Sequence, residues 1–264
     1  MNTPVIAPEV PTAAISDLAG RTALITGGSK GIGAATVDRF VKGGARVVTS
    51  GRSQPDSLPS GVEYVVADAA TLDGVGRLAR RALEILGDID IIVNNAGAST
   101  PYPGGVLEID DAEWINDLNI NFLAAVRLNA ALLPAMYARG TGSIVNVSSA
   151  VTLSPPAPML HYASAKAALT TYTTGLAAEA GPHGVRVNTL TPGNVVSPGA
   201  DAVRRAIIDA VGADSPEAGG IPVPLGRQGQ ASDIAEAIAF LASDRAAWIT
   251  ATNLVVDGGQ IQTR

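Results

Sequence analysis

Two residues with acid–base potential, Tyr162 and Lys166, stand four positions apart in an Ala-rich segment of helical period. Residues at that spacing share one face of a helix. A free phenol has a pKa of about 10, and bringing it to about 7 takes roughly 4 kcal/mol, which one cation at about 4 Å supplies at an effective dielectric constant of about 20. The pair indicates an acid–base tyrosine tuned by a lysine. The alternative is a tyrosine packed at a helix start beside a lysine that extends to solvent.

A glycine-rich turn, Gly27-Gly28-Ser29-Lys30-Gly31-Ile32-Gly33, follows a short apolar run and precedes a helical segment. Glycines let the backbone turn sharply and approach a pyrophosphate, whose charge then meets the free N–H groups of the helix start. The order strand, turn, helix favours a dinucleotide phosphate site, with a plain tight turn as the alternative. The residues expected to contact the cofactor in this turn are Gly27, Ser29, Lys30, Gly31, Ile32 and Gly33.

The choice between the two nicotinamide dinucleotides depends on the residue that follows the second strand. A carboxylate there binds the ribose 2′-hydroxyl of NAD, whereas an arginine accommodates the 2′-phosphate of NADP. This chain has Arg52 at that place, and Lys30 adds a second positive charge. NADP is therefore the preferred cofactor, NAD is the second possibility, and the alternative for Arg52 is a solvated surface residue.

The elements that must position these residues alternate along the chain, because short Val- and Ile-rich runs are followed by longer Ala-rich segments. This order is typical of strand–helix units around a parallel sheet. The expected strands are 22–26, 46–50, 62–67, 89–93, 143–147, 185–190 and 253–256. The expected helices are 33–42, 72–86, 111–137, 161–180, 201–211 and 232–242. The sequence predicts one α/β domain, 18–264, with a Rossmann-type doubly wound sheet of seven parallel strands and helices on both faces.

Composition excludes several classes of function. The chain has 264 residues and no cysteine, which excludes disulfides, thiolate metal sites and a cysteine nucleophile. A net charge of -6 without a basic cluster disfavours nucleic acid as a partner. With only two distant histidines, no metal site is expected. Residues 1–17 are expected to form a flexible tail without signal-peptide features, and no apolar run is long enough for a membrane span, so a cytoplasmic protein is expected.

Taken together, the motifs resemble the classical short-chain dehydrogenase/reductase family from about Asp17 to the C-terminus. Thr26 to Gly33 is similar to its TGxxxGxG turn, and Asn94-Asn95-Ala96-Gly97 to its NNAG. Tyr162 and Lys166 are similar to its YxxxK, and Pro192-Gly193 to the PG after its sixth strand. The resemblance implies that Asp68 contacts adenine. Its further expected cofactor contacts are Ala69, Asn95, Ala96, Gly97, Tyr162, Lys166, Pro192, Gly193, Val195 and Ser197.

The resemblance also implies the catalytic residues Asn121, Ser149, Tyr162 and Lys166. Ser149 lies thirteen residues before the tyrosine, as the family's catalytic serine does. Asn121 and Asn119 both compete for the role of the family's asparagine, and Asn121 matches its surroundings better. Ser149 would hold a substrate carbonyl, Tyr162 would donate or accept the proton, Lys166 would lower the tyrosine pKa and bind the nicotinamide ribose, and Asn121 would hold a water.

The implied function is interconversion of a carbonyl and an alcohol by hydride transfer, as an NADPH-dependent ketoreductase acting on a small molecule. The alternatives are a dinucleotide-sensing regulator without turnover, a cofactor-free dehalogenase of related fold and a structural scaffold. The family also implies a homotetramer or homodimer. His161 is expected at a helix start, with a substrate contact as the other possibility. The irregular stretch at about 194–229 is expected to form a substrate loop, and 53–61, with two prolines, a loop instead of the family's helix.

Overall fold

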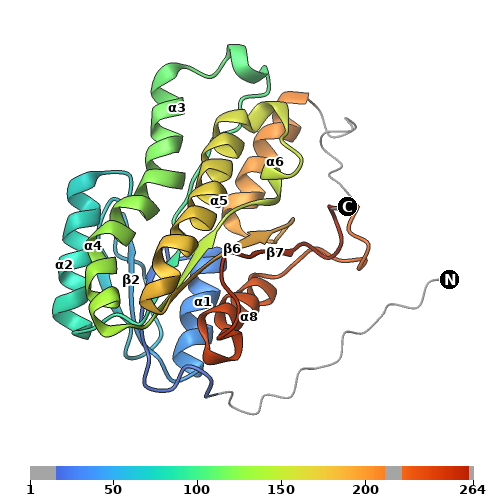
Figure 1. The fold of residues 1–264 in the computed structure, drawn as a ribbon. Coiled ribbons are helices and arrows are strands. Elements are labelled where there is room, and N and C mark those ends of the chain that lie inside the picture. Colours follow the sequence, from blue (N-terminus) through green and yellow to red (C-terminus); the bar gives the residue numbers. More distant parts are fainter. Residues whose placement is uncertain (1–15, 212–221, 262–264) are drawn as a thin grey trace.

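A computed structural model describes residues 16–211 and 222–261 (Figure 1). Within these residues, seven parallel strands form one sheet in the order β3-β2-β1-β4-β5-β6-β7. The strands are β1 Thr22–Thr26, β2 Arg46–Gly51, β3 Glu63–Val66, β4 Ile91–Asn94, β5 Gly142–Val147, β6 Val185–Pro192 and β7 Asn253–Val256. The central strands are buried on both faces, which explains their nearly continuous apolar sequences. The predicted fold class is confirmed.

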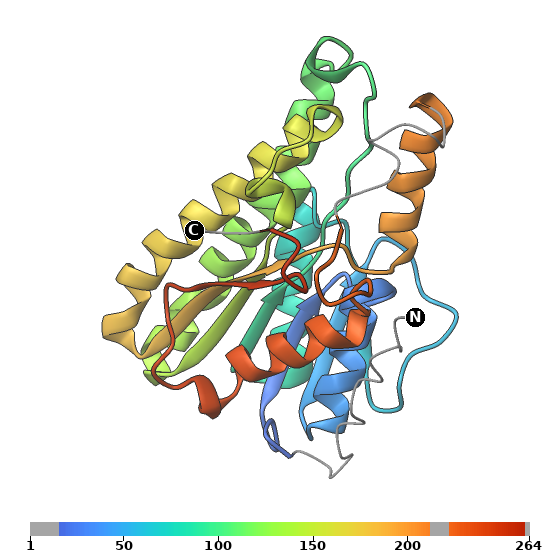
Figure 2. The same cartoon turned by 90° about the vertical axis from the view of Figure 1, so that its right-hand side faces the viewer.

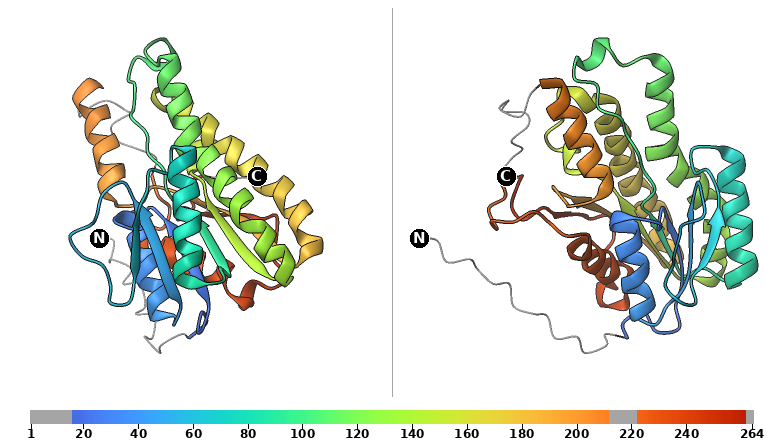
Figure 3. Two further views of the ribbon diagram at one scale, coloured as in Figure 1. Left: turned by 90° about the vertical axis from the view of Figure 1, so that its left-hand side faces the viewer. Right: turned by 180° about the vertical axis from the view of Figure 1, so that it is seen from behind.

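Helices cover both faces of the sheet. The α-helices are α1 Gly31–Lys42, α2 Leu72–Leu86, α3 Asp111–Leu118, α4 Ala124–Arg139, α5 Leu160–Ala180, α6 Pro198–Val211 and α8 Ala231–Ala242. On one face α1 and α8 pack side by side (Figure 2), and on the other α2, α4 and α5 lie in a row (Figure 3). Two buried apolar clusters, one on each face, join these helices to the sheet.

The strand order places the ends of β1 and β4 next to each other at the centre of the sheet. In an open parallel sheet, ligands bind at the carboxyl ends of the strands where the order reverses. Here β1 leads outward to β2, whereas its other neighbour, β4, begins the second half of the sheet. Helices α3 and α6 rise beyond this carboxyl edge (Figure 1). The expected site residues therefore converge at the edge that the topology favours.

The structure changes three expectations about the elements. The helix expected at 111–137 is α3 and α4 joined by a π-helical segment, Asn119–Leu123. The tail prediction fails at its last residue, because Asp17 is 6% exposed at its side chain and pairs with Arg39 at 2.8 Å. Residues 1–15 lie outside the described residues. The expected substrate loop contains α6, and its residues 212–221 lie outside the described part.

Two other expectations concern loops and membranes. The 53–61 crossover between β2 and β3 contains no helix, as predicted from its prolines. The helical run Asp111–Arg139 is long and apolar enough to cross a membrane by length and composition. In this fold its Leu128, Leu132 and Met136 are part of the cluster shared with α2 and α5. It is therefore packed as a core helix of the domain.

Candidate active site

The glycine turn leaves room for a phosphate at the start of α1. A Cβ on Gly33 would lie 2.1 Å from the carbonyl oxygen of Gly27, and one on Gly28 would lie 2.0 Å from Thr49 Oγ1. The turn is thus too close to its neighbours for any side chain at these two positions. Helix α1 has no acidic residue in its first turn, and its N-cap Lys30 makes no side-chain capping bond. The free N–H groups and positive dipole end of α1 fit a bound pyrophosphate.

The segment after β4 is fastened to the end of β1. The backbone N–H groups of Asn95 and Ala96 both donate to Thr26 Oγ1 at 3.0 Å, and Asn95 Nδ2 donates to the carbonyl oxygen of Thr26 at 3.0 Å. A Cβ on Gly27 would lie 3.0 Å from Ala96 Cα. These contacts hold the expected cofactor residues of the two segments against each other.

Lys166 and Asn121 meet at Gly97, where only a glycine leaves enough space. A Cβ there would lie 2.8 Å from Asn121 Oδ1 and 3.3 Å from Lys166 Nζ. Lys166 is 2% exposed, and its Nζ donates to the carbonyl oxygen of Val147 at 2.9 Å. The sheet and the α5 helix therefore hold the ammonium group at the end of β5.

Asn121 lies in the π-helical segment between α3 and α4 and is buried. Its Nδ2 donates to the carbonyl oxygen of Ala98 at 2.8 Å, and its Oδ1 accepts from the Ala98 N–H at 3.2 Å. The competing Asn119 instead accepts from Arg127 at 2.7 Å and donates to the carbonyl oxygen of Ile115. Of the two asparagines, Asn121 is the one next to Lys166.

Ser149 and Tyr162 come together from the end of β5 and the first turn of α5, with the Ser149 hydroxyl near enough to the phenol to affect its pKa. Burial raises the pKa of Tyr162 to about 12, against the lowering effect of the nearby Ser149 hydroxyl. Lys166 Nζ lies 5.9 Å from the tyrosine ring centroid. Burial also lowers the pKa of Lys166 to about 8. The lowering of the Tyr162 pKa by Lys166 stays a prediction, because burial acts in the opposite direction on the tyrosine and also lowers the pKa of the lysine.

Beside the glycine turn, Arg52, the arginine expected at the ribose, follows β2, and Asp68 and Ala69 follow β3. Arg52 and Lys30 are both exposed, as is Asp68, whose Oδ1 accepts from the Ala70 N–H at 3.0 Å. Ala69 is buried. The two cations lie on the turns that follow β2 and β1, which are neighbouring strands. A phosphate bound beside the first turn of α1 would face both turns.

The segment after β6 approaches the glycine turn from the opposite side. Pro192 ends β6, the Gly193 N–H donates to the carbonyl oxygen of Val256 at 3.0 Å, and Val195 forms a bridge with Gly229. Ser197 Oγ accepts from the Ala200 N–H at 3.2 Å at the start of α6. A Cβ on Gly31 would lie 3.4 Å from Ser197 Cβ. The structure thus brings the expected contacts after β6 next to the phosphate turn.

Comparison with known proteins identifies the family. The family model described as Enoyl-(Acyl carrier protein) reductase matches residues 27–260, a range that holds every expected catalytic and cofactor-binding residue. This chain belongs to the short-chain dehydrogenase/reductase family. The dehydrogenase/reductase is accordingly an NAD(P)-dependent oxidoreductase, as the resemblance of its motifs implies.

Several relatives of this dehydrogenase/reductase extend over nearly its full length. The 3-oxoacyl-(acyl-carrier-protein) reductase FabG of Salmonella typhimurium is 34% identical over 250 residues, 91% of this chain and 97% of the relative. L-xylulose reductase of Bos taurus is 34% identical over 258 residues, 93% of this chain and 98% of the relative. The crystal structure of levodione reductase has a TM-score of 0.81 and 29% identity, and the match covers 92% of this chain and 98% of that one.

Sequence reasoning missed Tyr64 of β3, whose hydroxyl lies at the ribose side of the turn. Its OH donates to the carbonyl oxygen of Ser53 at 2.8 Å, and Ser29 lies near enough to affect its pKa. A Cβ on Gly51 would lie 2.3 Å from this hydroxyl oxygen. A tyrosine in an expected strand was the available signal, but its neighbours Ser53 and Ser29 lie in two other segments of the chain.

Sequence reasoning also missed a buried cluster in which Glu113 and Asp117 of α3 meet His161 of α5. Their ligand atoms lie within 4.8 Å of one another. His161 Nε2 lies 3.1 Å from the carbonyl oxygen of Thr100, which can only accept, so that this nitrogen carries a proton. A metal would need the same nitrogen free of its proton. The contacts of Asp117 and His161 therefore favour a hydrogen-bonded group next to Tyr162 over a metal site.

Proposed function

We propose that this enzyme is an NADPH-dependent ketoreductase with Tyr162 as its proton donor. The observation that carries the proposal is the convergence of Ser149, Tyr162, Lys166 and Asn121 at the carboxyl ends of β4 and β5, beside the phosphate turn. A nucleotide-sensing regulator without turnover would need the turn but not a serine and a tyrosine placed together beside a buried lysine. The alternative of a sensor is therefore the weaker of the two.

Bound NADPH would supply the hydride to the carbonyl carbon. The residues of the chain would do the rest: Ser149 Oγ would donate to the substrate oxygen and orient it, and the Tyr162 hydroxyl would give its proton to the same oxygen. Because burial raises the pKa of Tyr162 to about 12, the phenol keeps its proton at neutral pH. The protonated phenol can serve as the proton donor in the reductive direction. Lys166 would contribute positive charge beside the oxygen that loses its proton, and it would bind ribose hydroxyls.

The preference for NADP rests on the charges around the expected 2′-position. Neither Arg52 nor Lys30 forms an ion pair within the described part of the chain, so both remain available for a phosphate. An arginine is suited to a phosphate because its guanidinium can donate two parallel hydrogen bonds. Ser29 of the glycine turn and the nearby Tyr64 hydroxyl would add neutral donors.

The substrate class is drawn from the relatives. The names of the three relatives above describe reduction of a 3-oxoacyl group, a ketose and levodione, respectively. We therefore propose a small-molecule carbonyl as substrate. The description of the matched family favours a second candidate, reduction of an enoyl double bond. The cytoplasm as location and a homotetramer or homodimer as assembly remain proposals, the latter to be measured by light scattering after size exclusion.

The test combines nucleotide binding with turnover. Tryptophan fluorescence is titrated with NADPH and NADH, and the loss of NADPH absorbance is followed with a 3-oxoacyl thioester, an enoyl thioester, a ketose and a cyclic diketone. Tyr162→Phe should lower the rate on the accepted carbonyl by about 10² to 10⁴ and leave the NADPH dissociation constant nearly unchanged. Tyr137→Phe is the matched control, since Tyr137 stacks on His183 near the start of β6, at the opposite end of the sheet.

The outcomes separate the candidate functions. No binding of either nucleotide would overturn the enzyme proposal, and binding without turnover on any member of the panel would favour the sensor. Oxidation of NADPH with the enoyl thioester alone would favour the second candidate. A Tyr162→Phe rate within tenfold of the parent would show that the proton comes from another group.

A further inference from the structure

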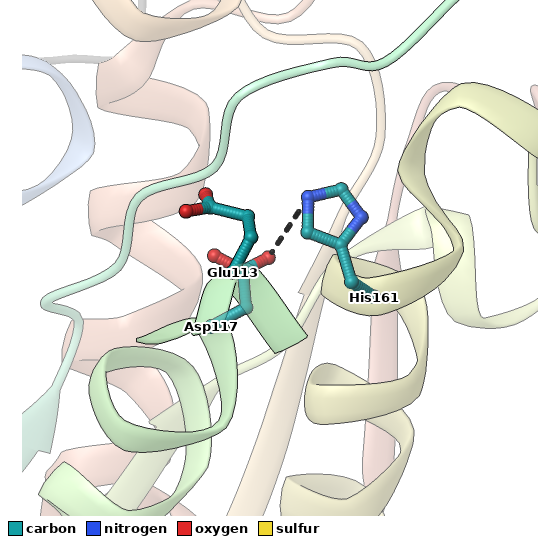
Figure 4. A group of neighbouring side chains, drawn as sticks. All are labelled: Glu113, Asp117 and His161. Carbon is teal, nitrogen blue, oxygen red and sulfur yellow. Dashed lines mark ion pairs between the residues drawn. The ribbon is translucent and has the colours of Figure 1, made fainter. Parts of the chain in front are cut away.

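The side chains of Asp117 and His161 face each other across the contact between α3 and α5 (Figure 4). His161 is 0% exposed and Asp117 is 1% exposed, and His161 Nε2 lies 3.5 Å from Asp117 Oδ2. His161 directly precedes Tyr162 in the chain, and Lys166 lies on the same helix. The segment after β4 contacts both groups: a Cβ on Gly97 would lie 3.3 Å from Lys166 Nζ, and Ser99, two residues further on, donates to Asp117 Oδ2 at 3.2 Å. The buried carboxyl group and Lys166 therefore lie along the same short segment.

Hydrogen bonds fix the orientation of both groups. Ser99 Oγ donates to Asp117 Oδ2 at 3.2 Å, and His161 Nε2 donates to the carbonyl oxygen of Thr100 at 3.1 Å. Asp117 Oδ1 and His161 Nδ1 are buried and find no partner among the described residues. The carboxyl group thus has fewer donors than an ionised form would use, so its charge depends strongly on its surroundings.

Aromatic rings close the cluster from solvent. The His161 ring makes edge-to-face contacts with Tyr102, at a centroid distance of 5.4 Å, and with Trp114, at 6.1 Å. In such a low-dielectric setting, charges that are not in contact still influence one another. The titratable groups that face Asp117 are Glu113 of its own helix, Tyr102 of the preceding loop, and His161, Tyr162 and Lys166 of α5.

The protonation of Asp117 and that of Lys166 are linked. Burial raises the pKa of Asp117 to about 7, while the Ser99 hydrogen bond and the Lys166 charge oppose the increase and Glu113 adds to it. Burial lowers the pKa of Lys166 to about 8, and the Asp117 charge opposes that decrease. Both groups are therefore charged together mainly between about pH 7 and about pH 8.

We propose that Asp117, hydrogen-bonded to Ser99 and packed against His161, is a positioning residue whose ionised form keeps Lys166 protonated. The inference rests on the proposed function only in the role that Lys166 plays there. The effect acts through charge, because no hydrogen bond or ion pair joins Asp117 to Lys166 among the described contacts. The ionisation of Asp117 near neutral pH thereby changes the charge of Lys166 in the pH range in which the Tyr162–Lys166 pair must act.

The experiment observes Lys166 directly and needs no substrate or nucleotide. The chain has only three lysines, Lys30, Lys42 and Lys166. Protein labelled with ¹³C at lysine Cε therefore gives three NMR signals, and Lys166→Arg assigns the one that disappears. In Asp117→Asn the Lys166 titration midpoint should fall by about 0.5 to 1 pH unit, because the opposing carboxylate charge is lost. The matched control Asp111→Asn removes an exposed carboxylate from the same helix and should leave the midpoint unchanged.

A second variant keeps the test decisive if Asp117→Asn does not fold. Ser99→Ala removes a donor to the carboxylate, so that Asp117 ionises at higher pH and the Lys166 midpoint should fall by a smaller amount in the same direction. The proposal is overturned if the Lys166 titration midpoint is unchanged in Asp117→Asn or in Ser99→Ala, provided that the variant is folded. This result is independent of turnover, whereas failure of the proposed function is recognised by active Tyr162→Phe enzyme.

A turnover readout distinguishes a charge effect from a structural one. On the accepted substrate, the ratio of parent to Asp117→Asn kcat/KM should be constant below about pH 6, where Asp117 carries its proton in the parent, and should rise above about pH 7. A ratio that is the same at every pH means that Asp117 only supports the packing of α3 on α5, and it would refute the inference.

Discussion

Substituting Gly33 with alanine tests the close approach at the phosphate turn. The added Cβ would lie 2.1 Å from the carbonyl oxygen of Gly27 and 2.6 Å from Asn95 Nδ2, whereas ordinary contacts begin at 3.4 Å. The Gly27 oxygen belongs to the backbone, so the turn and the start of α1 must separate by about 1 Å. Forced overpacking of this kind typically costs about 1 to 3 kcal/mol.

Two measurements follow from this displacement. In a chain of this size each kcal/mol shifts Tm by about 2 to 4 °C, so Gly33→Ala should lower Tm by about 2 to 12 °C. The same shift moves the N–H groups that face the pyrophosphate, and NADPH affinity should fall by about tenfold to a hundredfold. Differential scanning calorimetry gives the first quantity and isothermal titration calorimetry the second.

The matched control is Gly76→Ala in the interior of α2. The nearest atom to a Cβ there is Arg80 Nη1 at 3.5 Å, the end of a flexible side chain. Alanine stabilises a helix interior over glycine by about 0.5 to 1 kcal/mol, so Tm should rise slightly and NADPH affinity should not change. The reasoning is refuted if Gly33→Ala keeps the parent Tm and affinity, or if both variants lose stability equally.

Three further predictions concern charge and burial. Arg52→Asp should shift the ratio of kcat/KM for NADPH over NADH toward NADH by about tenfold or more, and an unchanged ratio would leave Arg52 a surface residue. Asn146→Leu should lower the free energy of unfolding by about 1 to 3 kcal/mol in urea titrations, because buried Asn146 joins Asn94, at 2.7 Å, to Thr173, at 2.8 Å; an unchanged urea midpoint would contradict this. Since the pKa of Asp117 is raised from 3.8 to about 7, its ionisation destabilises the fold, and this penalty is absent below about pH 4 and complete above about pH 7. As pH rises through this window, the Tm of the parent should therefore fall relative to the Tm of Asp117→Asn. A constant difference between the two Tm values would refute the raised pKa of Asp117.

The strands were predictable because a buried parallel strand is an apolar run with polar ends. The expected β1 and β7 agree with the structure at both ends, and the expected α2 does as well. The helix expected over 111–137 was wrong in its middle. Apolar periodicity is too coarse to register the single extra residue of a π-helical turn, and the segment that contains Asn121 is where that turn occurs.

The site was predictable as a set of residues but not in its electrostatics. Spacing and family resemblance selected Ser149, Tyr162 and Lys166, which the structure brings to neighbouring strand and helix ends. The directions of the Tyr162 and Lys166 pKa shifts follow from burial, which depends on what packs around them and not on their spacing. The contact of Asp117 with His161 was missed for a similar reason, because it joins two helices whose mutual rotation no local pattern determines.

The π-helical segment constrains how many residues join α3 to α4, and not only which residues they are. Each residue of an α-helix advances the chain by about 100° around the axis. Deleting one residue within Asn119–Leu123 would restore a regular helix and rotate α3 by that angle against α4, turning Asp117 away from His161 while Leu128 and Leu132 kept their places in the core. Insertions and deletions within the 53–61 crossover, which contains no helix, should therefore be tolerated far better than a change of length at the junction of α3 and α4, which holds the buried Asn121.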